Sequence, residues 1–305
     1  MELRQFRYRL VDVFAERPFS GAGVAVVTDA RGLDTGTMQA IARELNREQT
    51  SFAFPPRSPS EPLHVRIFSP QTELPRAQCS TIATAFALDC ERTSTECQSS
   101  RRVVFEGQDG PVSVSNFARV LTARQPAPEL GSVYADVDAA TATLGLAQGD
   151  CVSGAPVRAA SSGVPFLVVP LRSRSVLQHI EFRKDIWERT VRLSEAPKII
   201  AFTLEAERAG STAKMRVFSP DIGVLEEAAT EMACGPLAAY LVRYGFLPTQ
   251  SPQLLVFEQG SEVCRPSLLH AAIERDGDRV TSVRVGGQCV SVGEGTISAP
   301  ARDDG

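Results

Sequence analysis

The sequence predicts two similar domains of mixed α and β structure, and three observations support this. The segment VRIFSP at residues 65–70 recurs as MRVFSP at residues 215–220, about half of the 305-residue chain later. Each copy is followed by a polar loop and then by a long apolar segment. Each half also carries a strand signal around Pro-Phe, at residues 17–27 and 162–171. Two copies of strand, loop and apolar helix indicate a duplicated unit.

The first half begins with alternating polar and apolar residues, which predict a strand rather than a signal peptide. Residues 34–46 are typical of a helix capped by Asp34 or Thr35, because the apolar residues of this segment fall on one helix face. Those apolar residues are Met38, Ile41, Ala42 and Leu45. A further strand, SFAF, is predicted at residues 51–54.

An apolar helix is predicted after each copy of the repeat. Residues 79–90 are apolar on almost every side, so the first of these helices should be buried over most of its surface. The second helix carries a series of large residues at the spacing of one helix face, namely Leu237, Tyr240, Leu241 and Tyr244. We expect Ser80 and Pro236 in the first turns of the two helices.

A stretch rich in Pro and Ala at residues 124–135 is the candidate linker, and the predicted domains are residues 1–124 and 125–305. Because the two apolar helices start after matching loops, we expect their N-termini to face a shared cleft between the domains. Helix N-termini present free N–H groups and a partial positive charge, which suit a carboxylate. A small-molecule site between the domains is therefore predicted.

The composition excludes several classes of protein. Hydrophobic residues make up 43% of the chain and charged residues 22%, which is typical of a soluble globular protein. A formal net charge of −4 gives no basic surface for nucleic acid. The sequence has no apolar segment near the roughly 18 residues that a membrane span requires, so we expect no membrane partner and a cytoplasmic location.

The cysteine and histidine patterns predict neither disulfides nor a metal site. Seven cysteines are present, an odd number without a Cys-x-x-Cys pair, which argues against a disulfide framework and a structural zinc site. The three histidines lie far apart in the sequence. A Gly-x-Gly at residues 21–23 lacks the third glycine and the following helix of a dinucleotide fingerprint.

Glu48 is a candidate proton-transfer group. It lies where the predicted helix at residues 34–46 gives way to a strand, a position from which a side chain can reach a cleft. A partly desolvated carboxyl group there could act as a general acid or base, because burial raises its pKa toward the working pH. The alternative interpretation is a solvated loop glutamate.

Cys79 and Cys234 are interpreted as occupying equivalent places, each near the start of an apolar helix. A helix N-terminus lowers the pKa of a thiol, so a facing pair could remove a proton from one side of a carbon and return it on the other. The alternative interpretation is two small buried residues. Three acidic residues, Glu226, Glu227 and Glu231, precede or begin the second helix, where stabilising the helix dipole is their default role.

Five segments together resemble the PhzF-like family, named for the phenazine-biosynthesis isomerase, within the wider diaminopimelate-epimerase-like fold. These segments occur in the family's order and span most of the chain. They are VDVFAERPFSGAGVAVV (11–27), MQAIARELNREQTSF (38–52), VRIFSPQTELPRAQCSTIATAFAL (65–88), MRVFSPDIGVLEEAATEMACGPLAAYL (215–241) and FEQGSEVCRPSLL (257–269).

The resemblance implies an α+β fold of two pseudo-symmetric domains, each a β-barrel-like sheet around a central helix, with the active site between them. It also implies a homodimer and no cofactor or metal. The family's catalytic glutamate falls on Glu48, which would make this residue the general acid/base that shuttles a proton within a small unsaturated substrate.

The chain departs from the family pattern in both binding loops. It has Gln78-Cys79-Ser80 where the family has Gly-His-Pro, and Glu226-Glu227-Ala228 where the family has Glu-Asp-Pro. It has Thr230-Glu231-Met232 where the family has Thr-Gly-Ser. These changes favour a divergent isomerase of another secondary-metabolite or antibiotic pathway over phenazine synthesis. Enzymes of lincosamide-type pathways, which act on pyrroline or proline-like amino acids, are an example.

The leading hypothesis is therefore a cofactor-independent isomerase with an amino-acid-like substrate. Its expected catalytic residues are Glu48, Cys79 and Glu227. Its expected substrate-binding residues are Ser20, Gln78, Ser80, Thr81, Glu231, Met232, Cys234 and Gly235. Two alternatives remain open at this point: a two-thiol epimerase or racemase that uses Cys79 and Cys234, and a non-catalytic ligand-binding protein.

Overall fold

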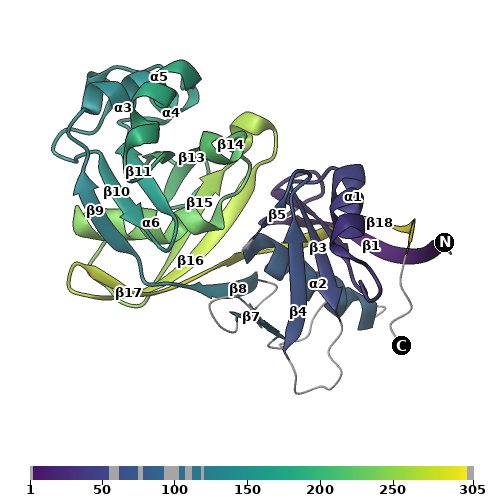
Figure 1. Cartoon of the computed structure of the whole chain (residues 1–305). Coiled ribbons are helices and arrows are strands. Elements are labelled where there is room, and N and C mark those ends of the chain that lie inside the picture. The colour runs from purple at the N-terminus through teal and green to yellow at the C-terminus, as the bar shows by residue number, and fades with distance from the viewer. Residues whose placement is uncertain are drawn as a thin grey trace. The chain divides into compact units, whose positions relative to one another are not determined.

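The computed structural model describes residues 3–54, 62–74, 78–92, 103–106, 112–117 and 120–300. The chain forms two compact units, Met1–Arg124 with Gly286–Gly305, and Gln125–Val285. Their elements are labelled in Figure 1. The C-terminal strand β18 (Cys289–Pro300) pairs antiparallel along the whole of β1 (Leu3–Val13). For that reason the last 20 residues join the first unit, whereas the predicted second half ran to residue 305.

The first unit is a barrel-like sheet around one helix. After β1 its elements are β2 (Ala22–Val27), α1 (Thr35–Leu45), β3 (Gln49–Phe54), β4 (Leu63–Phe68), β5 (Glu73–Leu74), α2 (Gln78–Arg92), β6 (Val103–Glu106), β7 (Val112–Phe117) and β8 (Val120–Gln125). The strands pair in the order β18–β1–β2–β3–β4–β6–β7–β8, and β5 also pairs with β4. Helix α2 contacts β1, β2, β3 and β7, which makes it the core of this unit.

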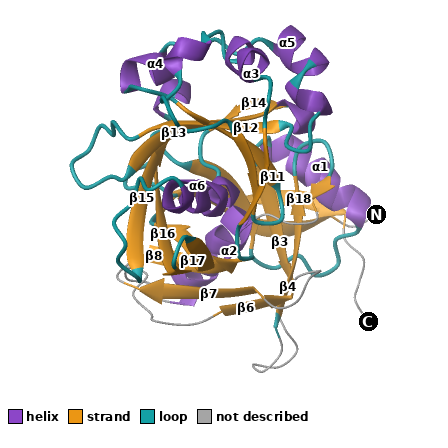
Figure 2. Cartoon of the chain, turned by 90° about the vertical axis from the view of Figure 1, so that its left-hand side faces the viewer, coloured by secondary structure: helices purple, strands orange, loops and turns teal. Residues whose placement is uncertain are grey.

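The second unit repeats this plan. Its elements are β9 (Glu129–Val133), α3 (Val137–Thr143), η1 (Gln148–Asp150), β10 (Arg158–Ser161), β11 (Pro165–Pro170), α4 (Arg174–Gln178), α5 (Lys184–Arg189), η2 (Val191–Leu193), β12 (Lys198–Thr203), β13 (Ala213–Ser219), η3 (Pro220–Ile222), β14 (Val224–Glu227), α6 (Glu231–Arg243), β15 (Gln253–Gln259), η4 (Ser261–Val263), β16 (Ser267–Asp276) and β17 (Arg279–Gly287). The strands pair in the order β9–β10–β11–β12–β13–β15–β16. Figure 2 shows α6 surrounded by these strands.

The two units share not only their topology but also their pairing register. In the first unit β2–β3 and β4–β6 are parallel pairs, and in the second unit β11–β12 and β13–β15 are parallel pairs. Arg66 of the first repeat lies opposite Phe52, and Arg216 of the second repeat lies opposite Ala201. The predicted duplication and the α+β fold class are therefore confirmed, and the paired residues of β2, β3 and β4 have counterparts in β11, β12 and β13.

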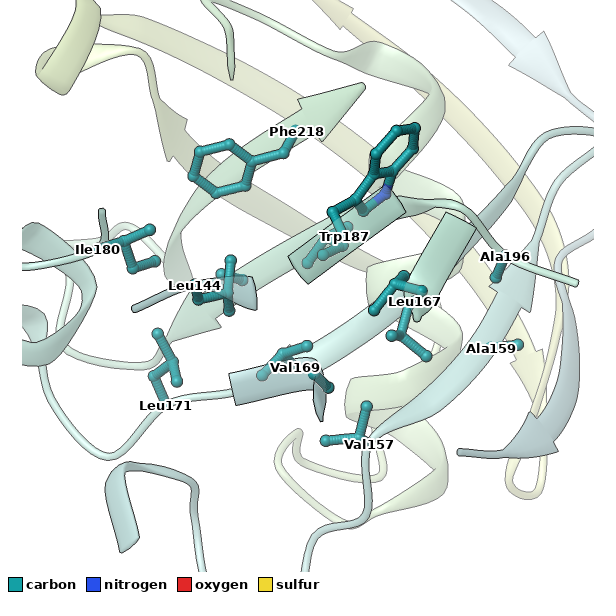
Figure 3. Packing of buried hydrophobic residues seen from close by; sticks show 14 of the residues in the cluster. Leu144, Val157, Ala159, Leu167, Val169, Leu171, Ile180, Trp187, Ala196 and Phe218 are labelled. Carbon is teal, nitrogen blue, oxygen red and sulfur yellow. The ribbon is translucent and has the colours of Figure 1, made fainter. Parts of the chain in front are cut away.

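Each sheet also carries helices on its outer face. In the first unit α1 packs Met38, Ile41 and Ala42 against the strands, as the periodicity predicted. Its ends are set by Asp34, whose carboxylate accepts the Thr37 N–H at 2.8 Å, and by a left-handed residue after Leu45. In the second unit α3, α4 and α5 take this place over a larger apolar cluster that includes Trp187 and Phe218 (Figure 3).

The central helices start earlier than the sequence indicated. Helix α2 begins at Gln78 and α6 at Glu231, so Ser80 is the third residue of its helix and Pro236 the sixth. The expectation that Pro236 lies in the first turn was wrong, because the chain before it is already helical. Helix α2 is buried from Cys79 to Ala85, as its apolar sequence predicted, and α6 is buried over nearly its whole length, although only one apolar face was predicted for it.

Candidate functional site

Glu48 occupies the turn that joins α1 to β3. The chain leaves α1 through Asn46, which adopts a left-handed conformation with φ of 45°. Glu48 follows two residues later with an exposed side chain, and Gln49 begins β3. The predicted position between a helix and a strand is confirmed. Within the first unit Glu48 is an exposed residue, which agrees with the solvated-loop interpretation rather than with a partly desolvated carboxyl group.

Gln49 joins this turn to the first turn of α2. Its side-chain oxygen accepts hydrogen bonds from the Ser80 hydroxyl at 2.6 Å and from the Cys79 thiol at 3.0 Å. Both donors are buried. Glu48 is therefore one residue along the chain from a fixed contact with the N-terminus of α2. We refer to Ser20, Glu48, Gln49, Cys79 and Ser80 as the α2 site.

Ser20 lies on the same edge of the sheet as Glu48. Strands β2 and β3 are parallel, with Val24 opposite Gln49, so the loop before β2 and the turn before β3 emerge together. Ser20 is buried, and its hydroxyl donates to the Arg17 carbonyl at 2.6 Å. The preceding residue, Phe19, has a left-handed backbone with φ of 65° and an exposed ring.

The backbone of Phe19 is held by a buried acid. Its N–H donates to the Asp12 carboxylate at 2.7 Å, and Asp12 itself is only 2% exposed. A left-handed aromatic residue is unfavourable unless its surroundings enforce it, and such strain concentrates at functional sites. Phe19 is thus a residue of this edge that the sequence patterns did not single out.

The other predicted residues of α2 are less open. Thr81 is buried, and the Ser80 hydroxyl is already engaged by Gln49. Gln78 begins the helix, and its side chain lies outside the part of the chain that the structure describes. The described side chains of α2 therefore contribute packing and hydrogen bonds to the α2 site, and Glu48 is the exposed ionisable group beside them.

In the second unit, Glu227 is the last residue of β14 and is half-buried. Its carboxyl oxygens accept hydrogen bonds from the Ser219 hydroxyl and, at 2.9 Å, from the Thr230 hydroxyl. Burial raises the pKa of the Glu227 carboxyl above its usual range, and the two hydroxyl donors together with nearby Lys198 act in the opposite direction. Burial is the largest of these influences, so Glu227 can hold a proton at a higher pH than an ordinary glutamate.

Gln259 fixes the start of α6. Its side-chain oxygen accepts the Thr230 N–H at 2.9 Å, and its amide nitrogen donates to the Glu227 carbonyl at 2.9 Å and to the Thr230 hydroxyl at 3.0 Å. We refer to Ser219, Glu227, Thr230 and Gln259 as the α6 site. Sequence reasoning missed Ser219 and Gln259 as members of this site. Ser219 lies in the repeated FSP segment, and Gln259 lies in the C-terminal segment that resembles the PhzF-like family.

The remaining predicted residues lie further along α6. Glu231 is buried, and its backbone carbonyl accepts the Gln125 amide at 2.8 Å; Met232 is half-buried. Cys234 is fully buried, which raises the pKa of its thiol well above the usual value. Gly235 is packed so closely that an added Cβ would lie 2.3 Å from the Ser162 hydroxyl. Cys234 and Gly235 are therefore packing residues of the helix interior.

The two thiols are not counterparts. Glu73 and Glu226 each form a two-pronged ion pair with the repeated arginine, and each lies five residues before its central helix. In that alignment Cys79 is the second residue of α2, whereas Cys234 is the fourth residue of α6. Cys79 therefore corresponds to Met232, and Cys234 corresponds to Thr81, so the equivalence inferred from the sequence was wrong.

A buried thiol with a raised pKa stays protonated at neutral pH, so Cys234 is poorly suited to remove a proton as a thiolate. The two-thiol alternative therefore loses the symmetry and the reactivity that motivated it.

Within the described ranges, no group of three or more His, Cys, Asp and Glu side chains is arranged to hold a metal ion. Likewise, no described helix is both long and apolar enough to cross a membrane.

The raised pKa of Glu227 predicts a pH dependence of stability. Since the folded state binds this proton more tightly than the unfolded chain does, the contribution is full below the ordinary glutamate pKa of 4.5 and is lost as pH rises through the folded value. In Glu227→Gln we expect this decline to disappear. Urea unfolding of both proteins at a series of pH values above 4.5 measures it, and parallel curves would contradict the assignment. Arg66 lowers the pKa of the Glu73 carboxyl, so the contribution of Glu73 to stability is instead lost as pH falls below 4.5.

Comparisons with known proteins agree with this architecture. A family model described as phenazine biosynthesis-like protein (PhzC-PhzF) matches residues 11–295. Trans-2,3-dihydro-3-hydroxyanthranilate isomerase from Pseudomonas chlororaphis is 35% identical over 296 residues, which cover 95% of this chain and 98% of that protein. An uncharacterized isomerase from Mesorhizobium japonicum is 33% identical over 304 residues, with the same coverage. The crystal structure of a PhzF-family protein from Bacillus anthracis has a TM-score of 0.86 at 23% identity and covers 96% of this chain and 99% of that chain.

Proposed function

Because this chain belongs to the PhzC-PhzF family of phenazine biosynthesis-like proteins and is an isomerase, we propose that it moves a proton, and with it a double bond, within a small unsaturated amino-acid-derived substrate. Glu48 is the general acid/base. Membership of an enzyme family whose relatives are named isomerases removes the alternative of a non-catalytic binding protein.

The observation that carries this proposal is the position of Glu48. Glu48 is an exposed residue of its unit, so a substrate can reach its side chain. Its backbone is fixed on one side by the left-handed end of α1 and on the other by Gln49, which is hydrogen-bonded to the first turn of α2. A general base requires this combination of access and fixed geometry.

The asymmetry between the duplicated units supports two distinct carboxyl roles. In the shared register Gln49 corresponds to Lys198, so the counterpart of Glu48 is Pro197. Glu227 lies opposite Val217, as Leu74 lies opposite Ile67. Each unit therefore has a carboxyl group at a place where the other unit has an apolar residue. This difference suits one exposed acid/base and one half-buried hydrogen-bonding group better than a symmetric pair of bases.

The reaction conserves all atoms of the substrate. The Glu48 carboxylate removes a proton from a saturated carbon next to a double bond, the electron pair shifts along the conjugated system, and the same carboxyl group returns a proton at another carbon. Glu227 binds a polar group of the substrate. Two of the Pseudomonas relatives are named as isomerases of trans-2,3-dihydro-3-hydroxyanthranilate, a cyclic unsaturated amino acid.

The substrate of this chain belongs to the same chemical class but binds in a different pose. Glu231 and Met232 stand at the start of α6, and the buried carboxyl group of Glu231 disfavours a substrate carboxylate there. A pyrroline or proline-like amino acid of a secondary-metabolite pathway fits this change. We further expect the enzyme to act as a cytoplasmic homodimer without a cofactor.

Turnover in D₂O tests the proposal. We expect proton NMR to show a shift of the double bonds in trans-2,3-dihydro-3-hydroxyanthranilate or in one of a set of pyrroline carboxylic acids, with product of unchanged formula apart from deuterium at the accepting carbon. If none of these acids shows a double-bond shift, the proposed reaction is wrong for this chain.

A further inference from the structure

The α6 site contains a chain of hydrogen bonds whose direction is fixed by its first member. The backbone N–H of Thr230 can only donate, so the Gln259 atom 2.9 Å from it must be the amide oxygen. The amide nitrogen then faces the Glu227 carbonyl at 2.9 Å and the Thr230 hydroxyl at 3.0 Å, and it donates one hydrogen to each. Rotating the amide by half a turn would lose the hydrogen bonds with the Thr230 N–H and the Glu227 carbonyl.

This orientation determines where the Thr230 hydrogen points. Because the Thr230 hydroxyl accepts from Gln259, its own hydrogen is directed at the second carboxyl oxygen of Glu227, 2.9 Å away. Ser219, which is fully buried, donates its hydroxyl hydrogen to the other carboxyl oxygen. Both oxygens of Glu227 therefore face donors, which favours the ionised carboxyl group against the effect of burial.

The first unit shows that the fold does not require this arrangement. There Leu74 occupies the counterpart of Glu227, and the counterpart of Ser219 is Ser69. The Ser69 hydroxyl instead serves its own turn: it accepts the backbone N–H groups of Gln71 and Thr72 and donates to the Thr72 carbonyl at 3.1 Å. The corresponding strand pair thus forms without a carboxyl group at this position, so Glu227 and its donors are an addition to the fold.

We propose that Gln259 is a positioning residue, which aims the Thr230 hydroxyl at Glu227 and thereby keeps this half-buried carboxyl group available as a hydrogen-bond acceptor for the substrate. The inference rests on the proposed function, since it assigns Glu227 to the same reaction. Gln259 itself is 1% exposed and acts through Thr230 rather than by touching the substrate.

Three variants test whether the Thr230 hydroxyl donates a hydrogen bond to Glu227. Thr230→Val removes the hydroxyl, Thr230→Ser keeps it, and Gln259→Glu replaces the donating amide nitrogen by an oxygen that attracts the Thr230 hydrogen away from Glu227. Glutamate δ-carbon NMR follows the titration of Glu227, and its signal is identified by its absence in Glu227→Gln. We expect the Glu227 titration to move to higher pH in Thr230→Val and Gln259→Glu and to stay at the wild-type position in Thr230→Ser.

Activity provides the second measurement. For Thr230→Val we expect kcat/KM to fall about tenfold or more, in line with the loss of a hydrogen bond to a charged group, and the pH–rate profile to move with the NMR titration. Ser69→Ala, the matched control in the other unit, should move neither. If Glu227 titrates at the same pH in Thr230→Val as in the wild type, the inference is wrong. Because the NMR measurement needs no turnover, it distinguishes this outcome from a failure of the proposed reaction.

Discussion

Glu48→Gln is expected to reduce turnover by at least about 10³-fold while leaving the fold unchanged. Glutamine retains the size and hydrogen-bonding capacity of the side chain but cannot accept and return a proton. The side chain is exposed in a turn whose backbone is held by Asn46 and Gln49, so no core contact is lost. The measurement is kcat/KM on the substrate identified in D₂O, together with circular dichroism and the unfolding temperature.

Two variants make this result specific. Glu44→Gln changes an exposed glutamate of α1 four residues away and should retain full activity. Glu48→Asp keeps an ionisable group but shortens its reach, so it should retain measurable turnover. Activity of Glu48→Gln within a factor of about ten of wild type would remove Glu48 from the proton-transfer role.

The second prediction with a large effect concerns stability, and the equivalent ion pair of the first unit provides its control. Arg216 pairs with Glu226 in a two-pronged ion pair whose side chains are only 9% and 10% exposed, and it also donates to the carbonyls of Leu177 and Ile180. Removing one partner of a buried pair leaves the other charge uncompensated. We therefore expect Arg216→Ala to lower the free energy of unfolding by about 3–5 kcal/mol.

Arg66 and Glu73 form the same pair in the first unit, but with exposed fractions of 25% and 41%. Each arginine also lies over the ring of the phenylalanine two residues later, at 5.3 Å in both units. Solvent screens the first pair, so Arg66→Ala should cost only about 1 kcal/mol or less. Urea unfolding of the two variants measures the difference. Equal losses would mean that burial of the second pair adds nothing to its contribution.

The double variant Arg216→Met with Glu226→Leu extends this test. Replacing both members of a buried ion pair by apolar residues of similar size is often neutral or stabilising, because the cost of desolvating two charges is removed as well. The double variant should therefore recover most of the stability lost in Arg216→Ala. Continued loss would indicate that the Leu177 and Ile180 carbonyls, left without their donor, account for most of the effect.

Local patterns predicted much of the first unit correctly. The helix at residues 34–46 was recognisable because its cap, its apolar face and its end all lie within 13 residues. The same reasoning placed Glu48 between a helix and a strand. The starts of the central helices were less predictable, since the residues that hold the start of α6, such as Gln259, come from a distant strand.

The α6 site shows where sequence reasoning stopped. Glu227 was identified through the resemblance to the family, but its donors Ser219 and Thr230 and their orientation by Gln259 are contacts across 3 to 32 residues. No periodicity encodes which buried hydroxyl faces which carboxyl group. The supposed equivalence of Cys79 and Cys234 failed for a related reason, because only the ion pairs of Arg66 and Arg216 reveal how the two loops align.

The sequence by itself determined the duplication, the α+β class, the family resemblance and the position of Glu48, because these depend on repeated local patterns of apolar residues. Only the tertiary structure decided that β18 completes the first unit, that the thiols are not counterparts, and that Glu227 is half-buried among oriented donors. Burial and hydrogen-bond partners arise from residues that are distant in sequence, and those two quantities set the charge and the access of a side chain.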